Sequence, residues 1–293
     1  MNNYHIPVLL QEVLTNLTIQ PGELYIDATL GGGGHTFAMI AQGARVLGID
    51  VDEDAIVHVR ENLKSHGITE GKELTMAKGN FAKIDEFATN SHFNPVSGIL
   101  LDIGVSSHQL DTPERGFSFQ DGPLDMRMDS SLTVSAKELI NGLTEKELVD
   151  VFERLGEEHA ARKIARAIVE RRKQAPIVTT GELAELIRRS SFGGQSVHPA
   201  TRVFQALRIA VNDELFVLEQ ALPKALMLLR PGGRLAVISF HSLEDRIVKK
   251  TFESMASKGM GKIITHKPIQ ATDEEVLQNR RSRSAKLRVI EKI

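Results

Sequence analysis

Two carboxylates stand where apolar, strand-like runs of the chain end. Asp50 follows the run 45–49, and Asp102 closes the run 98–102. An acid at the tip of a parallel strand can accept hydrogen bonds from both hydroxyls of a ribose. A carboxylate can also accept a proton that a reacting group releases. We therefore interpret Asp50 as a nucleoside-binding acid and Asp102 as a functional acid, with a purely structural role for Asp102 as a cap left open.

Four consecutive glycines at 31–34 lie between the first strand-like run and a helical stretch. Glycines let the backbone approach a ligand closely, and a helix N-terminus offers unpaired N–H groups. The dinucleotide pattern Gly-x-Gly-x-x-Gly fails, because its last position falls on Thr36 or Phe37. A phosphate-binding Gly-x-x-x-x-Gly-Lys-Ser/Thr loop is absent as well. The pattern favours a cofactor with adenosine but no phosphate, and S-adenosylmethionine meets that description.

The segments that must position these residues alternate between strand-like and helical patterns. Short apolar runs separated by helices predict a parallel sheet with helices on both faces. A Pro-Gly-Gly turn, a further strand and a terminal hairpin resemble the second half of class I methyltransferases. That resemblance implies an α/β, Rossmann-like fold with an antiparallel strand at the end. The expected strands are 24–28, 45–49, 73–77, 98–102, 234–240, 262–265 and 286–290.

More than a hundred residues separate the fourth and fifth of these strands. A single crossover helix needs far fewer, so an insert is expected there. Its patterns are helical: Thr144 with Glu147 and Thr179 with Glu182 have capping-box spacing, and Pro199 suits the first turn of a long helix. The expected division is a discontinuous methyltransferase domain over 1–111 and 209–293 and an inserted helical domain over 112–208.

The composition is that of an ordinary soluble globular protein, with 41% hydrophobic and 25% charged residues. A formal net charge of −2 argues against coating nucleic acid by bulk charge but allows a local basic patch. The absence of cysteine excludes thiolate nucleophiles and cysteine zinc sites, and no histidines have ligand spacing, so no metal is expected. Without a long apolar run, neither export nor membrane insertion is indicated, and a cytoplasmic location is expected.

A more specific resemblance begins at Asp102. Residues 102–111 read Asp-Ile-Gly-Val-Ser-Ser-His-Gln-Leu-Asp, and 121–129 read Asp-Gly-Pro-Leu-Asp-Met-Arg-Met-Asp. These segments are similar to the bacterial family of 16S ribosomal RNA cytosine-N4 methyltransferases, and the resemblance spans nearly the whole chain. It implies methyl transfer from S-adenosylmethionine to N4 of a cytidine, with the small ribosomal subunit as the expected partner. Further matching segments are 5–12, 114–119, 198–209, 238–249 and 279–288.

The resemblance also implies individual site residues. The chemistry makes Asp102 the expected proton acceptor, with Ser106 or Ser107 as a secondary polar contact. Phe81 has two open interpretations, a cover for the adenine ring or a core residue. DNA amino-methyltransferases have Asp/Asn/Ser-Pro-Pro-aromatic here, which this chain lacks, so the aromatic group beside the base is left open. The cofactor contacts implied by the family are Gly33, Gly34, His35, Asp50, Phe81, Asp102 and Gln109.

Two basic clusters are candidates for binding RNA phosphates. The first cluster is Arg162, Lys163, Arg166, Arg171, Arg172 and Lys173, and the C-terminal one is Arg280, Arg281, Arg283, Lys286 and Arg288. The C-terminal cluster contains no acids, which makes it the better candidate.

Two other functions stay open: a methyltransferase of the same core acting on protein or a small metabolite, and a non-catalytic ribosome-assembly factor. A homodimer is also left open.

Overall fold

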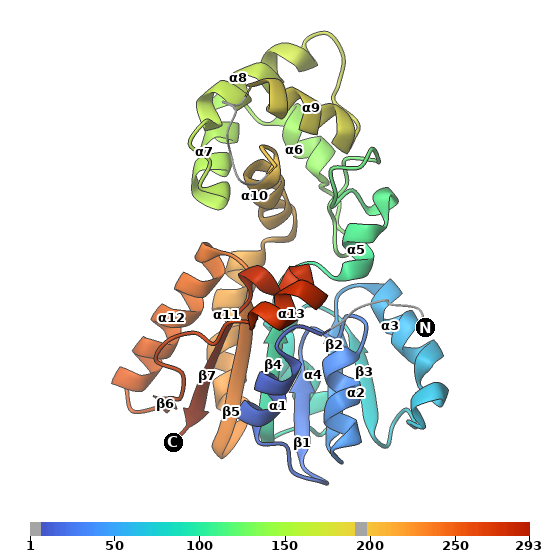
Figure 1. Ribbon diagram of the computed structural model, residues 1–293, viewed down its shortest axis with the longest axis vertical. Helices are drawn as coiled ribbons and strands as arrows, with labels where there is room; N and C mark the ends of the chain where they lie inside the picture. The colour runs from blue at the N-terminus through green and yellow to red at the C-terminus, as the bar shows by residue number, and fades with distance from the viewer. Residues whose placement is uncertain (1–6, 191–197) are drawn as a thin grey trace. The chain divides into compact units, whose positions relative to one another are not determined.

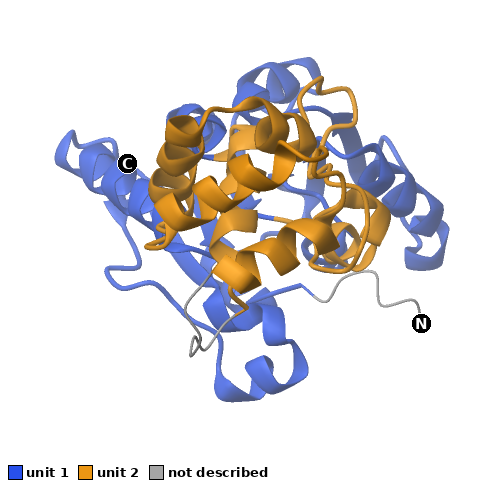
Figure 2. Ribbon diagram, turned by 90° about the horizontal axis from the view of Figure 1, so that it is seen from above, with its two compact units in different colours: residues 1–104, 215–293 blue, residues 105–214 orange. Residues whose placement is uncertain are grey.

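The computed structural model describes residues 7–190 and 198–293. The chain divides into two compact units, coloured separately in Figure 2. Unit 1 comprises Met1–Gly104 and Leu215–Ile293, and unit 2 comprises Val105–Glu214. Unit 2 is wider at both ends than the insert expected over 112–208. Within the described ranges, no helix is long and apolar enough to cross a membrane.

Unit 1 is built on a seven-stranded sheet with the order β3-β2-β1-β4-β5-β7-β6 (Figure 1). The first five of these strands are parallel to one another, and β7 is antiparallel to both β5 and β6. The predicted α/β class with a terminal antiparallel strand is confirmed. The strands are β1 Leu24–Asp27, β2 Arg45–Asp50, β3 Leu74–Lys78, β4 Val96–Asp102, β5 Leu229–Ser239, β6 Gly261–Ile263 and β7 Lys286–Lys292.

Helices cover both faces of this sheet, because successive side chains of a strand point to opposite sides. In β4, Ile99 and Leu101 pack with α4, α11 and α12, whereas Leu100 packs with α1, α2 and α3. All three of these β4 side chains are fully buried, as the apolar run predicted. The helices of unit 1 are α1 Leu10–Leu17, α2 Gly34–Ala41, α3 Glu53–Asn62, α4 Ile84–Asn90, α11 Glu214–Leu228, α12 Ser242–Ser257 and α13 Asp273–Gln278.

The order of the strands reverses between β1 and β4. From β1 the chain runs outward through β2 and β3, and it then returns to place β4 on the other side of β1. Open α/β sheets bind ligands outside the carboxyl ends of their strands at such a point. A ligand site is therefore expected at the carboxyl ends of β1, β2 and β4.

The Pro-Gly-Gly turn differs from its prediction. It was expected to precede a strand at 234–240, but β5 begins at Leu229 and includes the turn. Leu229 pairs with Val96 and Arg234 pairs with Gly98, so the residues between them bulge out of the ladder. Gly232, with φ of 76°, gives the backbone the left-handed conformation that this bulge requires.

Unit 2 is helical and has its own apolar core, which includes the fully buried Phe152. Thr144 and Glu147 form the predicted capping box at the start of α7. The helix expected from Pro199 begins instead at Thr201, and Pro199 lies in the preceding turn. The helices of unit 2 are α5 Ser107–Asp111, α6 Ala136–Gly142, α7 Glu145–Gly156, α8 Ala161–Arg172, α9 Thr180–Ser190 and α10 Thr201–Asn212.

Candidate active site

Three carboxylates lie at the carboxyl ends of neighbouring strands in unit 1. Asp27 ends β1, Asp50 ends β2 and Asp102 ends β4. Burial raises the pKa of Asp27 to about 7 and that of Asp50 to about 6, and it raises the pKa of Asp102 well above the usual range. Perturbed acids gathered at a sheet edge are typical of functional sites.

Asp50 connects the end of β2 to the glycine turn. Its Oδ2 accepts a hydrogen bond from the Gly31 N–H at 2.7 Å, and its Oδ1 accepts one from the Asp52 N–H at 2.9 Å. A carboxylate oxygen can accept more than one hydrogen bond, so both oxygens can still bind hydroxyl groups. The residues at this position therefore fit the ribose of a nucleoside cofactor, and Asp50 also holds the turn in place.

The glycines at the start of α2 are required by close packing. Gly33, the N-cap residue, has φ of 80°, and a Cβ there would lie 2.9 Å from the Phe37 ring. A Cβ on Gly34 would lie 3.0 Å from the Pro7 ring. Larger residues at these two positions would push the first turn of α2 away from its neighbours. The contacts of Gly33 and Gly34 with the cofactor stay predictions.

His35 lies between the backbone before α1 and the acid at the end of β4. The ring is 5% exposed, with Nε2 3.0 Å from the Val8 carbonyl oxygen and Nδ1 3.6 Å from Oδ2 of Asp102. The Asp102 N–H donates to Thr29 Oγ1 at 2.6 Å. Oδ1 of Asp102 is buried and has no hydrogen-bond partner among the described residues. One oxygen of the expected proton acceptor is thus paired with an imidazole, and the other is buried without a hydrogen-bond partner among the described residues.

Ser106 and Gln109 belong to unit 2, where they form the capping box of α5. Ser106 Oγ accepts a hydrogen bond from the Gln109 N–H at 3.2 Å, and Gln109 Oε1 accepts one from the Ser106 N–H at 3.0 Å. These bonds fix the start of α5 soon after Asp102 in the chain. The catalytic contact of Ser106 and the cofactor contact of Gln109 stay predictions.

Phe81 begins a short 3₁₀ helix, Phe81–Lys83, which follows β3. Its ring is partly buried against the core formed with α4, α11 and α12, so part of it packs as a core residue would. Asn80 precedes it and accepts a hydrogen bond from the Ala82 N–H at 2.9 Å. This hydrogen bond anchors the turn after β3. The adenine contact of Phe81 stays a prediction.

Two buried acids had no role in the sequence analysis. Asp27 accepts a hydrogen bond from Thr36 Oγ1 at 2.7 Å, which ties the first turn of α2 to β1. Glu244 is fully buried, accepts the Phe240 N–H at 2.8 Å and forms a capping box with His241 at the start of α12. The carboxylates of Asp27 and Glu244 contribute to the raised pKa of Asp102. Two features of the sequence could have pointed to these acids: Asp27 ends the first strand-like run, and His241 and Glu244 have capping-box spacing.

The C-terminal basic cluster is less available than expected. Arg288 is buried and donates to Asp245 at 2.6 Å, and Lys286 lies 3.4 Å from the same carboxylate. The cluster itself contains no acids, as the sequence indicated, but α12 brings Asp245 to β7. Arg280 and Arg283 are exposed.

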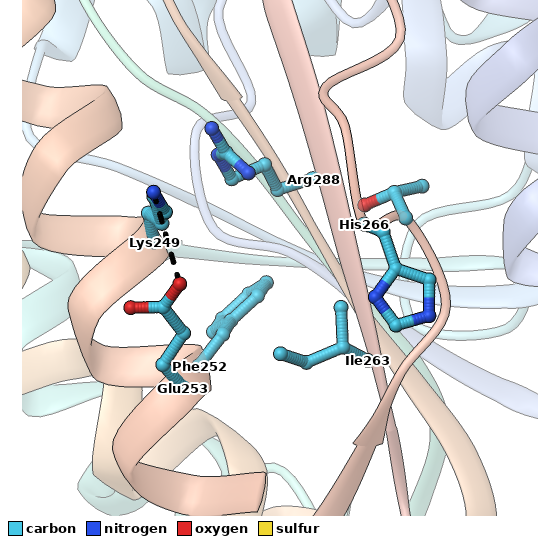
Figure 3. A pocket seen from close by; sticks show the side chains of 7 residues that line it. Lys249, Phe252, Glu253, Ile263, His266 and Arg288 are labelled. Carbon is cyan, nitrogen blue, oxygen red and sulfur yellow. Dashed lines mark ion pairs between the residues drawn. The ribbon is translucent and has the colours of Figure 1, made fainter.

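A pocket lies between α12 and the β6–β7 side of the sheet (Figure 3). Of its cationic side chains, Lys249 lies 3.8 Å from Glu253, and Arg288 is held by Asp245. This pocket contains none of the acids at the ends of β1, β2 and β4. In the described part of the chain, no group of three or more His, Asp or Glu side chains could hold a metal ion.

Comparison with known proteins places the chain in a family. The model of the MraW methylase family matches residues 2–293. "Ribosomal RNA small subunit methyltransferase H" of Carboxydothermus hydrogenoformans is 46% identical over 308 residues, covering 99% of this chain and 98% of that protein. The proteins of the same name from Chlorobium phaeovibrioides and Magnetococcus marinus are 48% and 47% identical, covering 99% and 100% of this chain and 97% and 100% of their own lengths. The chain belongs to the MraW methylase family.

Proposed function

We propose that this methyltransferase transfers a methyl group from S-adenosylmethionine to the exocyclic N4 of a cytidine in 16S ribosomal RNA within the small subunit. The names of its relatives support a small-subunit ribosomal RNA substrate. The observation that carries the choice of an amine is Asp102, whose buried Oδ1 has no hydrogen-bond partner among the described residues. An amine needs such an acceptor because it must lose a proton when it is methylated.

The cofactor would be held at the carboxyl ends of β1 and β2. Asp50 would bind the ribose hydroxyls, and the turn that Asp50 fixes through Gly31 would lie against the nucleoside. When bound, the cofactor supplies a methyl group on a sulfonium, which is already a good leaving group. The protein's own contribution is therefore placement of the substrate amine and acceptance of its proton.

Asp102 would act directly on the substrate amine. The lone pair of a cytosine amine is delocalised into the ring, so the nitrogen is a weak nucleophile. A hydrogen bond from its N–H to Oδ1 of Asp102 would favour a pyramidal nitrogen with a more available lone pair. As the nitrogen forms its bond to the methyl carbon, Oδ1 would receive the proton that the nitrogen loses.

Nucleoside mass spectrometry of ribosomal RNA tests this function. RNA from cells that lack the protein should lose N4-methylcytidine, or a doubly methylated derivative of it, and the purified protein should restore the modification on small subunits. An unchanged nucleoside profile would contradict the proposal. Labelled S-adenosylmethionine offered with RNA, protein extract and metabolites would then show which alternative substrate is methylated.

A further inference from the structure

His35 faces two hydrogen-bond acceptors at once. A carbonyl oxygen can only accept, so the contact of 3.0 Å with Val8 requires a hydrogen on Nε2. In the neutral ring, Nδ1 then carries a lone pair, and this lone pair faces Oδ2 of Asp102 across 3.6 Å. Two facing lone pairs repel each other, whereas a proton on Nδ1 makes the contact an ion pair. The geometry therefore favours one proton shared by His35 and Asp102.

The charges around this pair are negative. Asp27 on β1 and Glu244 on α12 both act on Asp102 from neighbouring elements, and Asp50 on β2 acts on Asp27. In the described ranges, His35 is the one basic side chain within ion-pair distance of Asp102. Without a proton on His35, burial and these carboxylates would favour the neutral acid at Asp102. A neutral Asp102 could not accept a second proton.

We propose that His35 is a positioning residue that takes up the proton shared with Asp102, so that Asp102 is ionised and its Oδ1 remains open to the substrate amine. The proposal rests on the proposed function, in which Asp102 accepts the amine proton. The imidazolium is hydrogen-bonded to Val8 through Nε2 and faces Oδ2 through Nδ1. During turnover the amine loses one proton and Oδ1 gains it, while His35 keeps its own.

The pH profile of the His35→Gln variant tests this role. The glutamine amide can still donate toward Val8 but cannot carry the charge. At pH 7 we expect kcat to fall at least tenfold, with the loss shrinking as the pH rises toward 9. The acid limb of the profile should move up by at least one pH unit, because a tenfold effect corresponds to one pKa unit. His266→Gln, which changes an exposed histidine, is the control and should leave the profile unchanged.

An equal loss of kcat at every pH would show that His35 is only structural, and it would overturn the proposal. So would a profile of His35→Gln that coincides with that of the unchanged protein. Saturating RNA and S-adenosylmethionine keep effects on binding out of this comparison.

Nitrogen NMR of the histidine rings supplies a readout that needs no substrate or cofactor. In the cofactor-free protein, the ring signals of His35, identified by their absence in His35→Gln, should titrate with a lower pKa in Asp102→Asn. The sign follows because removing an anion destabilises the imidazolium. Unchanged titration in Asp102→Asn, with RNA methylation intact in the unchanged protein, would overturn the pairing. A responsive His35 without N4-methylcytidine would support the pairing and overturn the proposed function instead.

Discussion

One carboxylate in each unit of the chain illustrates two opposite environments. In unit 1, Asp27 is 1% exposed at the end of β1, and burial raises its pKa to about 7. In unit 2, Glu185 lies on the surface of α9, where hydrogen bonds from Arg188 and Arg189 lower its pKa to about 2. The pKa of the same chemical group is thus shifted in opposite directions, by desolvation at the end of β1 and by paired charges on α9. A carboxylate buried at the end of a strand, such as Asp27, therefore costs stability once it is ionised.

The apolar cores of the two units do not show this contrast. In both, helices bury an apolar face: α11 contributes Leu218 and Leu222 in unit 1, and α7 contributes Leu148 and Phe152 in unit 2. Both units also use capping boxes at helix starts, as α7 and α12 show. The contrast therefore lies in the surroundings of particular polar groups and not in how the two cores are built.

The largest effect is expected from Asp102→Asn in unit 1. The amide keeps the shape of the side chain but cannot accept a proton at neutral pH. We expect kcat for RNA methylation to fall by about 10² to 10⁴, the range typical for the loss of a proton acceptor. Glu61→Gln, on the exposed surface of α3, is the control. A kcat of Asp102→Asn within threefold of that of the unchanged protein would contradict the role of Asp102.

A smaller effect, on stability, is expected from Asp27→Asn. Because its pKa is raised in the folded state, Asp27 favours folding at low pH, and this contribution is lost as the pH rises from about 4 through about 7. At pH 8 the variant should be more stable by up to about 4 kcal/mol, since one pKa unit corresponds to about 1.4 kcal/mol. Urea denaturation at pH 5 and pH 8 measures the difference. A variant that is less stable at both pH values would show that the carboxylate is needed for its bond with Thr36.

The smallest effect is expected from Glu185→Gln in unit 2. The lowered pKa means that this carboxylate favours folding above about pH 4 and stops doing so as the pH falls toward 2. Solvent screens an exposed pair, so we expect no resolvable change in the thermal midpoint at pH 7. Added salt should remove any residual difference, and a clear loss of stability that persists in high salt would contradict the contrast between the units.

Much of the fold was predictable because its signals are local. The apolar run 98–102 predicted a buried strand and lies in β4. The spacing of Thr144 and Glu147 predicted the capping box that begins α7. The errors arose where longer-range pairing decided the outcome. The Pro-Gly-Gly turn became part of β5 because Leu229 pairs with Val96, a contact that no local pattern reveals.

The same distinction applies to the candidate site. The acids at Asp50 and Asp102 could be chosen from the strands that precede them, and the family resemblance added the other residues. Their interactions could not be predicted, because they join segments that only the order of the strands brings together. The bonds of Asp50 to Gly31 and of His35 to Val8 are of this kind.

The sequence by itself determined the class of fold, the family and the acids that end two strands, since these depend on spacing and residue type along the chain. Only the tertiary structure decided the environment of those acids. It buried Asp27 beside Asp102, set His35 against Oδ2 and left Oδ1 without a hydrogen-bond partner among the described residues. The physical reason is that a carboxylate's proton affinity depends on desolvation and on neighbouring charges, and both are set by residues far away in the chain.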